Sequence, residues 1–176
     1  MAVRKIEIER FSVTSSKPFA AVVASIKAGV GQPDMVEFAR ATRGSESFAE
    51  LERKVQAGLS KTGLMLFMEL DHGAILRNES GHDSPKIVRL LIGNPLIMKE
   101  MAKHVPDAGS YAPVTILVDE HPEGVRLSYE RMASFLAPYG NADALAVARD
   151  LDSKSRTFFY SRSNDTTIHG EIYGQA

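Results

Sequence analysis

Residues 64–70, Leu-Met-Leu-Phe-Met-Glu-Leu, form an almost unbroken apolar run that decides the fold class. The run stands between a helical stretch and the turn Asp71-His72-Gly73, which is typical of an inner β-strand covered on both faces. The next apolar run, residues 86–92, is rich in β-branched side chains and predicts a second strand. Gly93-Asn94-Pro95 ends that strand and begins a helix, with Asn94 as the N-cap and Pro95 in the first turn.

Helices and strands alternate on both sides of these two strands. Period-2 alternation predicts a strand over residues 3–13. Helical spacing predicts one helix that begins near Pro18 and ends at Gly29, a second over 33–41 and a third over 48–61, the last with Gly63 at its C-terminal turn. Beyond a polar loop over 77–85, further patterns predict a helix over 95–104, a hairpin of 114–119 with 125–129, and helices over 132–136 and 141–152. This order predicts an α/β sandwich, a mixed and largely antiparallel sheet of about five strands with helices packed on it.

Composition excludes several classes of protein. The 176 residues carry 21 basic and 22 acidic side chains, a formal charge of −1, which does not suit a general nucleic-acid binder. Zero cysteine excludes disulfide frameworks, thiolate metal sites and cysteine nucleophiles. The length predicts a single domain over residues 1–160 with a polar tail over 161–176. We find no apolar run of membrane-spanning length and no secretory signal, so we expect a soluble, cytoplasmic protein with no membrane partner.

The order of these motifs resembles a known family. A predicted helix is followed by Gly63-Leu64, and the next predicted strand is followed by Asp71-His72. A second strand is followed by Gly93-Asn94-Pro95, and a hairpin ends at Leu127-Ser128-Tyr129. This series is similar to the domain of unknown function 302, a family of small bacterial and archaeal α/β domains. The resemblance covers residues 48–136, with residues 31–47 as a helical insertion. It implies an α/β fold that pairs as a homodimer, and it implies no established activity.

Five residues are candidates for ligand binding: Asp71, His72, Gly93, Asn94 and Tyr129. Asp71 and His72 could share a proton or a ligand, although adjacent residues of a strand point to opposite faces and the pair could simply end the strand. The helix N-terminus after Gly93-Asn94 could hold an anion, or it could be a plain capped turn. Tyr129 could add a phenol to the same pocket or pack between strands. If the sheet brings these residues together, they line one polar pocket at the strand ends.

No cofactor or metal is expected. His82-Asp83 follows Asp71-His72 by ten residues and supplies nitrogen and oxygen ligands, but the spacing matches no metal signature and a surface loop is the simpler interpretation. Met65, Met68, Met98 and Met101 occur at strand and helix spacings that indicate core filling rather than a haem or soft-metal site.

Three functions remain open from the sequence. One is a pure interaction protein whose apolar sheet face or helix is a dimer interface, and the other two involve a ligand or a substrate. The first is a homodimeric, non-catalytic module that binds a small ligand or a partner. The second is an enzyme acting on a small polar or anionic substrate with an Asp-His pair at a strand end. Because no catalytic motif is present, the sequence does not decide whether the chain is an enzyme.

Overall fold

The computed structural model describes residue 3 and residues 5–163. The strands are β1 (Arg10–Ser15), β2 (Met65–Asp71), β3 (Ile87–Gly93), β4 (Val114–His121) and β5 (Gly124–Glu130). The α-helices are α1 (Phe19–Ala28), α2 (Met35–Arg43), α3 (Phe48–Gly58), α4 (Gly73–Ser80), α5 (Pro95–Ala102), α6 (Met132–Leu136) and α7 (Ala142–Ser163). Two short 3₁₀ helices, η1 (Pro106–Ser110) and η2 (Ala137–Tyr139), complete these elements.

The five strands form one sheet in the order β1-β5-β4-β3-β2, and every neighbouring pair is antiparallel. The predicted α/β fold class and strand number are therefore confirmed. A single isolated parallel bridge, between Gly31 and Met65, is added at the outer edge of β2.

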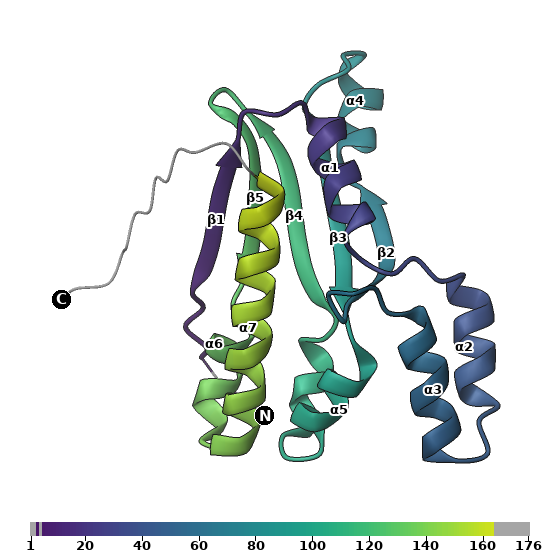
Figure 1. Ribbon diagram of the computed structural model, residues 1–176. Helices are drawn as coiled ribbons and strands as arrows, with labels where there is room; N and C mark the ends of the chain where they lie inside the picture. Colours follow the sequence, from purple (N-terminus) through teal and green to yellow (C-terminus); the bar gives the residue numbers. More distant parts are fainter. Residues whose placement is uncertain (1–2, 4, 164–176) are drawn as a thin grey trace.

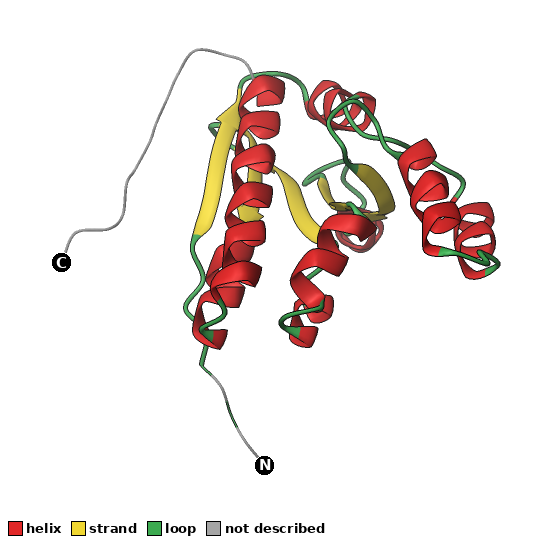
Figure 2. Ribbon diagram, turned by 60° about the horizontal axis from the view of Figure 1, so that its bottom comes forward, coloured by secondary structure: helices red, strands yellow, loops and turns green. Residues whose placement is uncertain are grey.

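One face of the sheet carries the core. Alternate residues of the central strands, such as Leu90 and Ile116, are buried there against α1, α5 and α7. These three helices lie on the same side of the sheet (Figures 1 and 2). The other side of the sheet, which we call the open sheet face, carries no member of this core cluster.

Strand β2 is an edge strand, so the prediction that it is covered on both faces is wrong. It pairs with β3 on one side, and its side chain Met68 is 51% exposed. A register shift between Leu66 and Met68 bends the strand, as a β-bulge does at a sheet edge. The apolar side chains of residues 64–70 are therefore partly covered at the edge of the sheet, rather than buried in its middle.

Residues 31–47, the predicted insertion, contain α2, which packs against α3 as a helical hairpin beside the β2 edge (Figure 1). Asp34 begins α2 by accepting hydrogen bonds from the N–H groups of Val36 and Glu37. Ser47 begins α3 by accepting from the N–H of Glu50, as the capping-box spacing predicts. Val36 is 77% exposed, so the outer surface of this hairpin remains in solvent.

Several predicted boundaries differ from the structure. The first strand spans 10–15 rather than 3–13, and α3 ends at Gly58 before a turn that contains Gly63 at φ +73°. Helix α4, which ends at Ser80, replaces residues 77–80 of the loop predicted over 77–85. Helix α7 runs to Ser163, well beyond the predicted end at 152, and absorbs the aromatic residues 158–160. The rest of the predicted tail, 164–176, lies outside the described residues.

Candidate functional site

Asp71, at the end of β2, is engaged by its own chain. One carboxylate oxygen accepts a hydrogen bond from the N–H of Ala74 at 2.9 Å, which caps the first turn of α4. The other accepts from Arg77 Nη2 at 2.6 Å. The hydrogen bond from Arg77 is the main reason that the pKa of Asp71 lies below its usual value. His72 follows at the N-cap of α4 and is exposed, so the two neighbours do not act on a common group.

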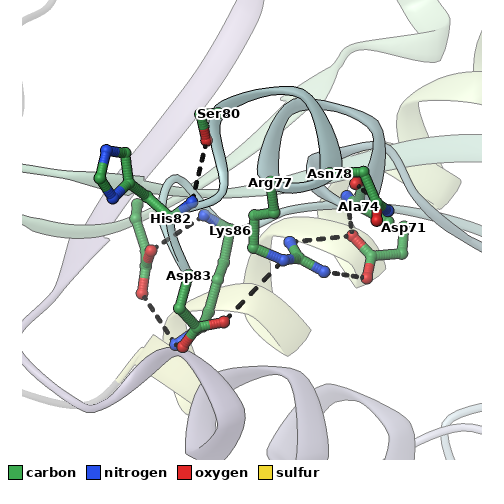
Figure 3. Close-up of polar contacts among 9 residues, drawn as sticks. Asp71, Ala74, Arg77, Asn78, Ser80, His82, Asp83 and Lys86 are labelled. Atoms are coloured by element: carbon green, nitrogen blue, oxygen red, sulfur yellow. Dashed lines mark hydrogen bonds and ion pairs between the residues drawn. The ribbon is translucent and has the colours of Figure 1, made fainter.

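A chain of charged side chains continues from Asp71 across the end of the sheet (Figure 3). Arg77 Nε lies 4.0 Å from Asp83 Oδ1, and Asp83 Oδ2 lies 3.3 Å from Lys86 Nζ. Lys86 Nζ lies 3.9 Å from Glu120 Oε1, while its backbone N–H donates to Glu120 Oε2 at 2.9 Å. The charges alternate in sign along this chain, so each is balanced by a neighbour.

The Asp71–Arg77 pair predicts a pH-dependent stability. Because the pKa of Asp71 is lowered in the folded state, the pair stabilises the fold above the ordinary pKa of 3.8 and loses this effect as the pH falls through the lower folded value. Asp71→Asn is therefore expected to lower Tm at pH 7, and the difference from the parent should shrink as the pH falls below 3.8. Thermal unfolding followed across pH checks this. Glu79→Gln, at an exposed position of α4, is the matched control, and an equal loss of Tm in both variants would contradict the pairing.

Gly93 and Asn94 lie at the opposite end of the β2–β3 pair. Met65 pairs with Gly93 and Asp71 pairs with Val88, so five residues of β3, roughly 17 Å at ~3.3 Å each, separate the two candidate turns. The Asn94 side chain accepts from the N–H of Leu96 at 2.8 Å, which confirms it as the N-cap of α5. It also donates to the carbonyl of Gly63 at 2.9 Å.

Tyr129 lies in a third place, on the covered face of the sheet beneath α7. It is 2% exposed, and its hydroxyl donates to Asp152 Oδ1 at 2.5 Å. Burial, followed by the nearby Asp152 carboxylate, raises the pKa of Tyr129 well above its usual value, so the phenol keeps its proton. The structure thus does not bring Asp71, His72, Gly93, Asn94 and Tyr129 into one pocket.

Two open depressions lie at the end of the sheet that carries Asp71. The first, which we call the α4 depression, measures about 330 Å³. It is lined by Ala74, Arg77, Asn78, Gly81, His82 and Asp83. The second, the β4–β5 depression, measures about 670 Å³. It is lined by Pro18, Phe19, Asp83, Ser84, Lys86, Glu120, His121, Pro122, Gly124 and Val125.

A further Asp-His pair, at the end of β4, was missed from the sequence. His121 Nε2 is hydrogen-bonded to Asp119 Oδ2, and Arg126 Nη2 donates to the same oxygen at 3.0 Å. Asp119 is 7% exposed. Residues two apart in a strand point to the same face, but the strand expected from the sequence ended at residue 119, and only the extension of β4 to His121 brings the pair together.

The described residues were compared with two further kinds of site, a metal-ligand group and a membrane-spanning helix. No group of three or more His, Cys, Asp or Glu side chains gathers there in a way that could hold a metal ion, and His82 and Asp83 do not meet Asp71 and His72 as a ligand set. Across the same part of the chain, none of the helices has the length and apolarity needed to cross a bilayer.

Fold and sites together define a two-layer α/β protein, with an antiparallel sheet, helices on one face and a charged cluster at one end. The family model "Domain of unknown function DUF302" matches residues 40–158, about two thirds of the chain, and the protein belongs to this family. The match extends beyond the expected 48–136 and includes most of α7.

A solved relative supports the fold. The crystal structure of an uncharacterised conserved DUF302 protein from Bacillus stearothermophilus superposes with a TM-score of 0.62. The alignment covers 88% of this chain and 98% of that chain at 10% sequence identity. No curated protein has a significant sequence match to the chain.

Proposed function

We propose that the protein is a cytoplasmic, homodimeric and non-catalytic module that binds a small polar ligand in the β4–β5 depression. The observation that carries this proposal is the depression itself. Its volume of about 670 Å³ falls within the range of roughly 300–1,000 Å³ typical of small-molecule sites. Its wall combines apolar side chains, among them Phe19 and Val125, with the polar groups of Lys86, Glu120 and His121, a mixture that such sites use for contact and orientation.

The charged groups around this depression favour binding over acid–base chemistry. Lys86 lies between the carboxylates of Asp83 and Glu120, and His121 is held by Asp119. Side chains fixed in this way present donors and acceptors in defined positions. A ligand that offers both an acidic and a basic group can replace part of this pairing without leaving a charge uncompensated.

Amide chemical shifts of ¹⁵N-labelled protein test the proposal. Titration with acetate, inorganic phosphate, ethanolamine and glycine at low salt is expected to give a saturable response with at least one probe, centred on Lys86, Glu120 and Gly124. Lys86→Ala should weaken that binding by about 10-fold or more, since a hydrogen bond to a charged group contributes about 1.5–3 kcal/mol.

The matched control is Lys61→Ala, at an exposed position outside the lining of the depression. It should bind like the parent. Responses confined to residues elsewhere, or unchanged affinity in Lys86→Ala, would contradict ligand binding at this depression.

The Asp119–His121 hydrogen bond favours a second candidate, an enzyme with an Asp-His pair at a strand end. Asp119 would fix the orientation of the His121 ring and stabilise its protonated form. His121 would accept a proton from the substrate or donate one to it. Turnover of an activated ester that His121→Ala abolishes and Asp119→Asn reduces would support this function. Equal turnover by all three proteins would remove it.

A further inference from the structure

We infer that the open sheet face binds a long-chain carboxylate, such as a fatty acid, with the anionic group at Arg89 and the alkyl chain on the apolar side chains beside it. This site is separate from the β4–β5 depression, because none of the residues that form it lines that depression.

Arg89, in the middle of β3, lies among aliphatic side chains on the open sheet face. Both of its neighbours in sequence are core residues, so its own side chain points to the opposite face. The register places Leu70 of β2 on one side of it and Leu117 of β4 on the other. Ile87 and Leu91 lie two residues before and after it on the same strand. These four aliphatic residues surround Arg89, and none of them belongs to the core cluster or packs against it.

The positive charge of Arg89 is not balanced within the described residues. Its Nη2 donates to Thr115 Oγ1 at 3.0 Å, which is a neutral partner, and its Nε is buried without a hydrogen bond. No carboxylate of residue 3 or residues 5–163 forms an ion pair with it. On the neighbouring strand, Asp119 is already engaged by Arg126 and His121.

An arginine without a counter-charge among aliphatic groups is unfavourable for the chain on its own, because a desolvated charge is stable only when it is paired. Arg89 is half-buried, so its guanidinium can still be reached from solvent. A carboxylate is a suitable partner, since its two oxygens match the planar N–H groups of a guanidinium. It also carries one negative charge, which balances the single cation.

The apolar surface continues from Arg89 along β3 toward Gly93. Met68 of β2 lies beside this path and is 51% exposed. Phe67 and Pro113 close the far end, since a Cβ at Gly93 would lie 3.3 Å from Pro113 Cβ and 3.6 Å from Phe67 Cε2. The four residues from Arg89 to Gly93 span roughly 13 Å at ~3.3 Å each, which is about the length of an extended decanoate chain.

Charge complementarity favours this ligand over other occupants of the face. A second copy would bring a second uncompensated Arg89 into the same contact and would leave both arginines without a counter-charge. A small inorganic anion would pair with Arg89 but leave the aliphatic side chains in solvent. A carboxylate on an alkyl chain satisfies both parts of the site, because its charge meets the guanidinium and each CH₂ group covers apolar surface.

Amide chemical shifts of ¹⁵N-labelled protein test the site with decanoate, decyltrimethylammonium and butyrate, each below the concentration at which it aggregates. Decanoate should give a saturable response centred on Arg89, Leu91 and Leu117. It should bind at least about 10-fold more tightly than decyltrimethylammonium, which has the same alkyl chain and the opposite charge. It should exceed butyrate by a similar factor, because butyrate has the same charge on a shorter chain.

Two substitutions separate the charge from the apolar surface. Arg89→Gln should weaken decanoate binding by about 10-fold or more and remove the preference over decyltrimethylammonium. Met68→Gln, on the exposed edge strand, should weaken decanoate binding and leave butyrate binding unchanged. Circular dichroism verifies folding, and Arg89→Lys, which keeps the charge, should retain the preference for decanoate if Arg89→Gln unfolds. Arg53→Gln, the same change at an exposed position of α3, is the matched control and should bind like the parent.

Three results would overturn the proposal. The first is equal affinity of the parent for decanoate and decyltrimethylammonium, or unchanged decanoate binding by folded Arg89→Gln, since Arg89 would then play no part. The second is the absence of a saturable response around Arg89, including a response confined to the β4–β5 depression. The third is a shift of the same amides when the parent is diluted without any probe, which would assign the face to a second copy. The two proposed sites report on different amides, so either can fail alone.

Discussion

Asp152→Asn is expected to lower the free energy of unfolding by about 3 kcal/mol, because it leaves a buried donor without its acceptor. Asp152 lies on α7 and is 6% exposed. Its carboxylate accepts from the Tyr129 hydroxyl at 2.5 Å and from the N–H groups of Met132 at 2.8 Å and Ala133 at 3.0 Å. It therefore caps α6 from another helix and satisfies a buried phenol on β5.

Asparagine keeps one acceptor oxygen and places an NH₂ group where the second stood. That group faces a donor, so at least one buried donor loses its partner, and the charge that attracts the start of α6 is also lost. Urea unfolding measures the change. The matched control is Asp150→Asn, two residues earlier and exposed on the same helix, which should stay within ~0.5 kcal/mol of the parent. Similar losses in the two variants would contradict the role of Asp152 as acceptor for the Tyr129 hydroxyl and for the N–H groups of α6.

Gly31→Ala is expected to cost at least about 3 kcal/mol, or to prevent folding. A Cβ at Gly31 would lie 2.0 Å from the carbonyl oxygen of Gly58, a backbone atom that no rotamer change can move away. Gly31 itself is held on both sides, since its N–H donates to Leu64 O at 2.9 Å and its carbonyl accepts from Leu66 N at 2.8 Å. The only relief is to break these bonds or to displace α3.

Gly109→Ala provides the comparison. A Cβ at Gly109 meets no atom within 4 Å, and the residue does not have a positive φ. The substitution should change the free energy of unfolding by less than about 1 kcal/mol, with a small gain from the reduced freedom of the unfolded chain. If urea unfolding gave equal values for the two alanine variants, the close approach of Gly31 to α3 would be disproved.

The starts of two helices could be predicted from the sequence, because helix N-caps have a strong residue preference. Asn94-Pro95 and Ser47 mark helix starts because their side chains satisfy specific N–H groups, and both are confirmed. Helix α4 was not predictable in this way. Its N-cap residue, His72, makes no side-chain capping bond, and the cap comes from Asp71, a residue that also ends the preceding strand.

The site was harder to predict because it depends on strand direction. Polar turns after successive strands meet at one edge when the strands are parallel, but β2 and β3 are antiparallel and place Asp71 and Asn94 at opposite ends. Lys86, Glu120 and His121, which do meet, come from the start of β3 and the end of β4. No short motif joins them, because the pairing of the sheet rather than the local sequence brings them together.

The bridge from Gly31 to Met65 has a consequence for how the protein behaves at high concentration. Strand β2 ends the sheet, and the free backbone groups of an edge strand can template pairing with another molecule. Gly31 pairs with the outward backbone groups of β2, since it accepts from the N–H of Leu66 and donates to the carbonyl of Leu64. The register shift that follows bends the strand, and the strand ends with the charged residues Glu69 and Asp71. The predicted insertion, residues 31–47, thus begins with the residue that blocks the β2 edge against pairing with another molecule.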